Sequence, residues 1–99
     1  VMAGAVIQTG SKIKKNTIIN TKVSVDHDCV IGSHVHLAPG VTISGGVQVA
    51  DDVHIGAGAT IIQEIRIGKK CLIGAGSLVL NDVKDGATVF GVPAREAKR

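Results

Sequence analysis

The sequence has 99 residues and a formal net charge of +3, and Phe90 is its one aromatic residue. This length suits a single domain, and the weak, dispersed charge without stacking aromatics argues against a nucleic-acid partner. No apolar run reaches membrane-spanning length and no signal-peptide pattern is visible, so we expect no membrane partner.

A six-residue repeat runs through most of the chain. Every sixth residue is aliphatic up to Val79, and a second register of small or medium uncharged residues lies two positions before the first. Residues two apart point to the same face of a strand, so each repeat predicts one short strand with a large and a small inward side chain. Hexapeptide periods are typical of a β-helix. The aliphatic series is Val1, Ile7, Ile13, Ile19, Val25, Ile31, Leu37, Ile43, Val49, Ile55, Ile61, Ile67, Ile73 and Val79.

The remaining residues of each repeat predict corners. Nine of the thirteen residues that lie three positions after a large aliphatic are Gly, Asn or Asp, the types that tolerate positive φ. Three strands and three corners then make one coil with a period of eighteen residues. The predicted fold class is all-β, a parallel β-helix shaped as a three-sided prism, with coils about 4.8 Å apart.

The two ends of the chain differ from the repeat. Val1 is already in register, so the pattern begins in mid-repeat and predicts a fragment of a longer protein or an exposed first coil. The series stops at Asp85. We therefore predict a β-helix over residues 1–84 and a C-terminal cap strand with a basic tail over residues 85–99, in which Phe90 covers the open end of the prism.

Both cysteines, Cys29 and Cys71, occupy the small inward register. We interpret them as core residues rather than as metal ligands or a disulfide. Their separation of forty-two residues is not a multiple of eighteen, which predicts different faces of the prism. Unpaired thiols indicate a reducing, cytoplasmic location.

None of the four histidines lies in an inward register. His27 is predicted at a corner between Asp26 and Asp28, and carboxylate neighbours fix a histidine tautomer as a general base requires. His36 and His54 are eighteen residues apart, which predicts stacked outward rings about 4.8 Å apart. His27 and His36 are half a coil apart, so a site that uses both would lie between two prisms, and a triangular prism packs naturally as a homotrimer.

Together these features make the sequence similar to the left-handed β-helix acyltransferases, and more narrowly to the branch that acetylates sugars. That branch includes sialic acid O-acetyltransferases and N-acetyltransferases of nucleotide-linked 4-amino sugars. The resemblance covers essentially the whole chain and supplies the left hand of the coil, since crossovers are otherwise right-handed. Besides the repeat, it depends on the strings at residues 25–32, 55–59, 73–77 and 91–95.

The resemblance implies an acetyl-CoA-dependent acetyltransferase acting on an amino or hydroxyl group of a sugar or nucleotide sugar. His27 would be the general base, Asp28 would orient it, and Asn20 would position the acceptor. The co-substrate acetyl-CoA would be bound by residues near its thioester, along its pantetheine arm and near its phosphates, namely His36, Ala57, Ala75, Gly91 and Arg95. No metal is implied.

Three alternatives stay open at this point. The Gly-Ala-Gly strings around Ala57 and Ala75 also meet the ordinary demands of corner geometry. The chain has no counterpart of the N-terminal sugar-nucleotide domain of the branch, which leaves a non-catalytic trimerisation or scaffold module as the second hypothesis. A zinc enzyme on the same fold is the third, suggested by His36 and His54, although the histidine spacing does not match that of zinc-binding relatives.

Overall fold

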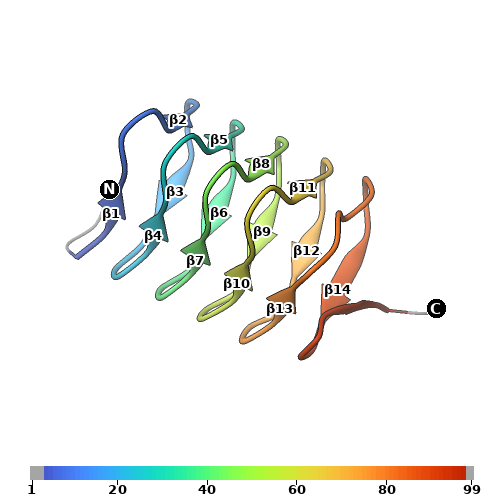
Figure 1. Ribbon diagram of the computed structural model, residues 1–99. Coiled ribbons are helices and arrows are strands. Elements are labelled where there is room, and N and C mark those ends of the chain that lie inside the picture. The colour runs from blue at the N-terminus through green and yellow to red at the C-terminus, as the bar shows by residue number, and fades with distance from the viewer. Residues whose placement is uncertain (1–3, 98–99) are drawn as a thin grey trace.

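The computed structural model describes residues 4–97, and its strands form three sheets wound into one solenoid, parallel throughout except for the antiparallel last strand β15 (Figure 1). Sheet 1 contains β1 (Val6–Ile7), β4 (Ser24–Val25), β7 (Thr42–Ile43), β10 (Thr60–Ile61) and β13 (Leu78–Val79). Sheet 2 contains β2 (Lys12–Ile13), β5 (Val30–Ile31), β8 (Gln48–Val49) and β11 (Arg66–Ile67). Sheet 3 contains β3 (Ile18–Ile19), β6 (His36–Leu37), β9 (His54–Ile55), β12 (Leu72–Ile73), β14 (Thr88–Phe90) and β15 (Arg95–Glu96).

The register of the sheets confirms the predicted period. Val25 lies opposite Ile43, and Ile43 lies opposite Ile61, so successive coils are offset by eighteen residues. The fold is the predicted left-handed parallel β-helix with three sides. Corners connect the sheets in a fixed order. The first corner leads from sheet 1 to sheet 2, the second from sheet 2 to sheet 3, and the third from sheet 3 back to sheet 1.

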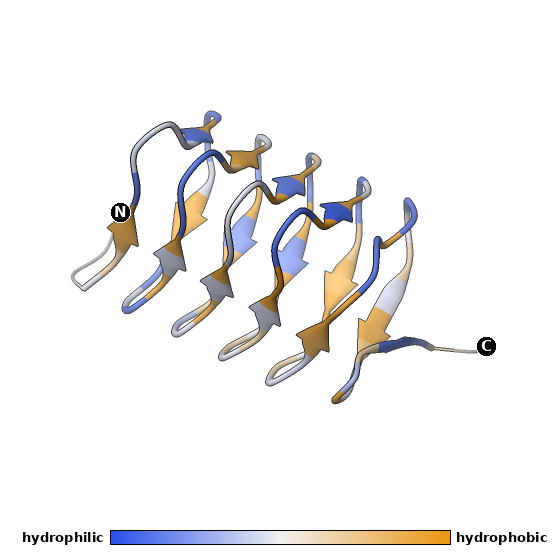
Figure 2. Cartoon of the chain, in the orientation of Figure 1, coloured by the Kyte–Doolittle hydropathy of each residue, from blue (hydrophilic) through white to orange (hydrophobic). Residues whose placement is uncertain are grey.

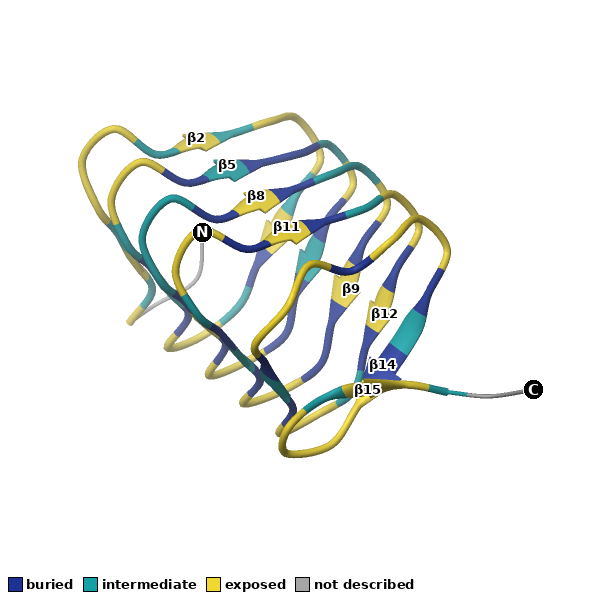
Figure 3. Cartoon of the chain, turned by 45° about the vertical axis from the view of Figure 1, so that its right-hand side comes forward, coloured by how far each residue is buried: buried dark blue, intermediate teal, exposed yellow. Residues whose placement is uncertain are grey.

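The core of the solenoid is a column of inward aliphatic side chains. Both predicted registers are buried from residue 19 onward, and Figure 3 shows this as dark blue segments that recur on every side of the coil. The outward positions differ between sheets. The outward residues of β2, β8 and β11 are hydrophilic in Figure 2, whereas β12 and β13 carry leucines on the outside.

The predicted corners have the expected backbone. Twelve of the thirteen residues three positions after a large aliphatic have positive φ, including lysines, a glutamate and His34. Asp82 is the exception, and the prediction is wrong there because the last coil is shorter. Val83 bridges to Ile67, which is sixteen residues away rather than eighteen, so the corner that would contain Asp82 has lost two residues.

The shortened coil moves the inward register at the C-terminal end. Val83 and Val89 take the inward positions, and β14 continues sheet 3 by pairing in parallel with β12. The prediction for Phe90 is therefore wrong. Its side chain points outward over Gly74, Phe90 is 56 % exposed, and the end of the core is closed by Val83, Ala87 and Val89.

Two sequence predictions extend beyond the described residues. The aliphatic series begins at Val1, and the basic tail ends at residue 99, and both positions lie outside residues 4–97. Residues 4–97 contain no helix with the length and apolar character needed to cross a membrane.

Both cysteines are free and buried, as predicted, and they precede strands of different sheets. The Cys29 thiol donates to the backbone oxygen of Ser44 at 3.1 Å, and the Cys71 thiol donates to that of Lys84 at 3.0 Å. Burial raises the pKa of both thiols. Each therefore stays protonated and remains a hydrogen-bond donor at neutral pH.

These thiols predict an alkaline loss of stability. The folded-state pKa lies above the unfolded value, so their contribution is complete below the ordinary thiol pKa and is lost as pH rises through the raised folded-state pKa. Above about pH 8.5, the wild type should therefore lose stability relative to a Cys29→Ser/Cys71→Ser variant. Thermal unfolding of both proteins from pH 7 to 10.5 measures this, and a difference independent of pH would contradict it.

Candidate active site

His27 lies at the first corner, between β4 and β5, where the sequence predicted it. The corner is tight because Asp28 adopts φ of 58°, a conformation that aspartate tolerates better than most residues. The backbone N–H of His27 donates to Oδ1 of Asp26 at 2.7 Å, and its carbonyl oxygen accepts from Gly46 at 3.1 Å. These bonds fix the backbone of His27, while its side chain remains 66 % exposed.

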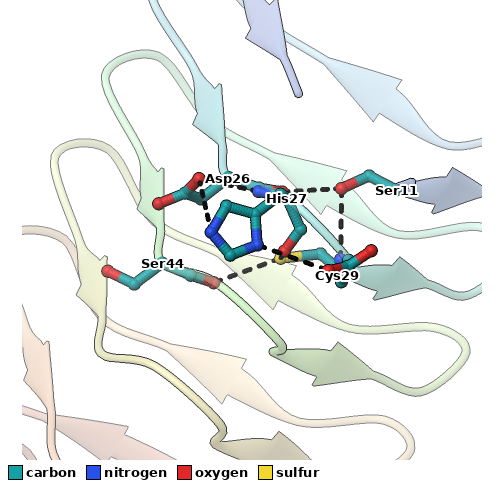
Figure 4. Close-up of polar contacts among 6 residues, drawn as sticks. Ser11, Asp26, His27, Cys29 and Ser44 are labelled. Carbon is teal, nitrogen blue, oxygen red and sulfur yellow. Dashed lines mark hydrogen bonds and ion pairs between the residues drawn. The ribbon is translucent and has the colours of Figure 1, made fainter. Parts of the chain in front are cut away.

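The His27 ring has a carboxylate near each nitrogen (Figure 4). Nδ1 lies 3.4 Å from Oδ2 of Asp28, and Nε2 lies 3.8 Å from Oδ1 of Asp26. Asp28 has the closer contact, which supports the role of orienting group that was expected for it. A proton on Nδ1 held toward Asp28 leaves Nε2 with a free lone pair.

A groove of about 640 Å³ runs along the first corner beside His27. Its walls come from the corners of three successive coils, namely residues 26–28, 44–46 and 63–64. Gly45 lies one coil after His27 and forms the surface against which the imidazole rests. A Cβ at residue 45 would lie 3.1 Å from Cε1 of His27, so only glycine leaves the ring its full room.

A second group of predicted residues lies around the third corner and on sheet 3. Nδ2 of Asn20 is 2.9 Å from Nε2 of His36 and donates to the backbone oxygen of Leu37 at 3.1 Å. Nε2 of His36 is then an acceptor, which places the proton of the neutral ring on Nδ1. His36 lies beside His54 with ring centroids 4.7 Å apart, close to the separation that the eighteen-residue spacing predicted, but the rings are tilted by 54° rather than stacked.

Ala57 and Ala75 lie one coil apart at the exposed third corner. The coils are tightly stacked there, since a Cβ at Gly56 would lie 2.6 Å from the backbone nitrogen of Ala75. Within residues 4–97 the amide N–H groups of Ala57 and Ala75 donate to no backbone carbonyl. Two amide donors without a backbone acceptor therefore lie one coil apart along one edge of the prism.

The C-terminal residues continue this edge. Gly91 donates its amide to Oγ of Ser77 at 3.1 Å, and its carbonyl oxygen accepts from Leu78 at 3.0 Å. Arg95 lies in β15, antiparallel to β14 and opposite Phe90, and its side chain is exposed. Gly91 is thus fastened above Ala75, and Arg95 stands on the outer edge of sheet 3.

The structure separates the site residues into two groups. Asn20, His36, Ala57, Ala75 and Gly91 gather around the third corner and sheet 3, whereas His27 and Asp28 lie at the first corner. In a three-sided prism the first corner is opposite sheet 3, and the cross-section measures about 22 × 20 Å. The two groups therefore lie on opposite sides of the prism.

The described residues offer His36 and His54 as two neighbouring imidazoles. Among residues 4–97, no group of three or more His, Cys, Asp and Glu side chains lies close enough to hold a metal ion. A zinc site requires a third or fourth ligand of this kind. The zinc alternative therefore has no support from the described part of the chain.

Sequence reasoning missed several residues of the first corner. Gly45 contacts the His27 ring, and Ser11, Cys29 and Ser44 brace the corner from within (Figure 4). A signal for Gly45 was present, because it lies eighteen residues after His27. Ser11 lies in the small inward register, and nothing in that pattern distinguishes it from a core residue.

A comparison with protein families matches this chain to bacterial transferase hexapeptide (six repeats), over residues 10–45, 28–63 and 46–81. A curated relative is acyl-[acyl-carrier-protein]–UDP-N-acetylglucosamine O-acyltransferase of Helicobacter pylori, 49 % identical over an alignment of 43 residues, and the match covers 37 % of this chain and 16 % of the relative.

Solved structures give a longer match. PerB of Caulobacter crescentus, in complex with CoA and GDP-perosamine, is 39 % identical with a TM-score of 0.94 over 97 % of this chain. The acetyltransferase domain of PglB of Neisseria gonorrhoeae, in complex with acetyl coenzyme A, is 40 % identical with a TM-score of 0.94 over 96 % of this chain. The match covers 46 % of each of these two relatives, so this chain spans about half their length. The matched repeats cover most of this sequence, and the chain belongs to the bacterial transferase hexapeptide family.

Proposed function

We propose that the protein is an acetyl-CoA-dependent acetyltransferase that modifies an amino or hydroxyl group of a sugar or nucleotide sugar. The observation that carries this proposal is the His27–Asp28 pair, in which Nδ1 of the ring lies 3.4 Å from Oδ2 of Asp28 beside an open groove. Such a pair is what a general base for acyl transfer needs. The likeness to structures in complex with CoA, acetyl coenzyme A and GDP-perosamine supports the substrate class.

In this proposal the reaction begins at Nε2 of His27. The acceptor nitrogen or oxygen attacks the thioester carbon, and its proton moves to Nε2 as the new bond forms. The C–S bond then breaks, the acetyl group stays on the acceptor, and the proton passes to the departing thiolate. Asp28 stabilises the imidazolium that forms in between.

The site would lie between two subunits of a homotrimer. His27 of one subunit would face the third corner of its neighbour, where the Ala57 and Ala75 amides would bind the pantetheine arm. His36 would lie near the thioester, Gly91 along the arm, and Arg95 near the phosphates. Asn20, held against His36, would act on the acceptor from that same neighbouring subunit. A cytoplasmic location is part of the proposal because acetyl-CoA is consumed.

The experiment that tests this function uses the complete protein that contains this chain. It is incubated with acetyl-CoA and a panel of nucleotide-linked amino sugars and hydroxyl sugars. We expect release of free CoA thiol together with an acceptor that has gained one acetyl group. The absence of both transfer and CoA binding at millimolar coenzyme would instead favour the scaffold module.

A further inference from the structure

One side-chain hydroxyl braces the corner that contains His27 from the coil before it, beside the backbone bond in which the Asp28 N–H donates to the oxygen of Thr9 at 3.3 Å. Oγ of Ser11 donates to the backbone oxygen of Asp26 at 2.6 Å and accepts from the backbone nitrogen of Cys29 at 3.1 Å (Figure 4). These two backbone groups lie on either side of His27 and Asp28. One side chain therefore joins the start of the corner to its end.

The brace continues through Cys29 to the coil after it. The buried Cys29 thiol donates to the backbone oxygen of Ser44 at 3.1 Å. Ser44 is bonded to Gly45, whose Cα forms the surface against which the His27 ring lies. Both the backbone of His27 and the surface under its ring are thus tied to the same internal column of polar atoms.

The fold itself does not require polar atoms in this column. The next two members, one and two coils after Cys29, are Val47 and Ile65, and both are buried and apolar. The corner at residues 62–64 nevertheless forms, and Glu64 there has φ of 61°. Hydroxyl and thiol groups occur in this column only around the corner of His27, within residues 4–97.

We propose that Ser11 is a positioning residue for His27, a proposal that rests on the function proposed above. The His27 side chain is largely exposed, so its own packing restrains it little. Its reach into the groove depends on the backbone of residues 26–29. Loss of the Ser11 hydroxyl removes the bonds to Asp26 and Cys29 that hold the two ends of this corner, although the bonds of His27 to Asp26 and Gly46 remain. The corner then becomes more mobile, and Nε2 spends less time in line with the acceptor.

Thr17 provides a matched control within the same chain. Its Oγ1 donates to the backbone oxygen of Gly32 at 2.7 Å and accepts from the nitrogen of Val35 at 3.3 Å. This is the same brace at the second corner, which contains no residue of the proposed site. It also shows that threonine can form the brace from this register.

The test compares Ser11→Ala, Ser11→Thr and Thr17→Val in the complete protein. Hydrogen exchange should become faster at Cys29 in Ser11→Ala and at Val35 in Thr17→Val, because each amide loses its acceptor. We expect Ser11→Ala to lower kcat by about 10- to 100-fold with KM for acetyl-CoA unchanged. Thr17→Val and Ser11→Thr should both keep the wild-type kcat.

The imidazole nitrogen signals of His27 give a second readout that does not depend on turnover. We expect one sharp set in the wild type and in Thr17→Val, and broadened or doubled signals in Ser11→Ala. If the wild type transfers no acetyl group, the proposed function fails, and these signals alone decide the role of Ser11. An unchanged kcat or unchanged His27 signals in Ser11→Ala, or equal losses in Ser11→Ala and Thr17→Val, would overturn the proposal.

Discussion

Replacing His27 by alanine should lower acetyl transfer by about 10²- to 10⁴-fold, which is the usual contribution of a general base. The loss should fall on kcat, because His27 would act on the acceptor proton, whereas residues of the neighbouring subunit's third corner would bind acetyl-CoA. The assembly should stay folded, since the His27 side chain is 66 % exposed and fills no part of the core. Initial-rate kinetics together with circular dichroism measure both effects.

His34→Ala is the control for this experiment. His34 also lies at a corner with positive φ and is exposed, but it belongs to the second corner and to neither group of site residues. It should keep wild-type turnover. Near-normal turnover of His27→Ala, or an equal loss in His34→Ala, would remove His27 from the mechanism.

The second large effect concerns the core. Ile43→Ala should lower the free energy of unfolding by about 2–5 kcal/mol, because the side chain is fully buried in a middle coil and its removal leaves a cavity in the core. Thr42→Ala, in the same strand β7 but on the exposed face, should change it by less than about 0.5 kcal/mol.

Denaturant unfolding of both variants at one protein concentration measures this contrast, since assembly makes stability depend on concentration. The two strand positions differ mainly in which way they point. Similar losses of unfolding free energy in Ile43→Ala and Thr42→Ala would mean that burial of the inward residues does not account for the stability of the coil.

The repeat could be predicted from sequence because it is enforced at every coil. A solenoid buries its core only if the aliphatic residues recur at a fixed interval, so the pattern from Ile7 to Val79 determines the strands, the corners and the outward direction of all four histidines. It also placed the His36 and His54 rings on neighbouring strands. The spacing alone was enough for that result.

The end of the solenoid was not predictable in this way. The last coil drops two residues, which moves the inward positions to Val83 and Val89 and turns Phe90 outward. A fixed period cannot anticipate a deletion, and a large aromatic residue near an end is easily taken for a lid. Once Val83 is aligned with Ile67, the remaining pattern follows.

Contacts between coils were the other part that sequence reasoning left out. The Asn20–His36 contact and the brace from Ser11 to Asp26 join residues about one coil apart. Their existence depends on where each side chain points within the corner, and hexapeptide spacing does not specify that. The groups of the proposed site were named from motifs, and the half-coil spacing of His27 and His36 already predicted that they lie apart.

The most direct test of the account is subunit complementation in the complete protein. His27→Ala removes the base at the first corner, and Ala57→Arg should block the third corner that would bind acetyl-CoA. Each variant alone should assemble and be inactive. Co-expressed at equal amounts and purified through two tags, mixed trimers should regain about a third of wild-type activity, because one of the three interfaces in each mixed trimer would combine an intact His27 with an intact third corner. If each site lay within one subunit, every subunit would have a defect, and mixed trimers without activity would contradict the account.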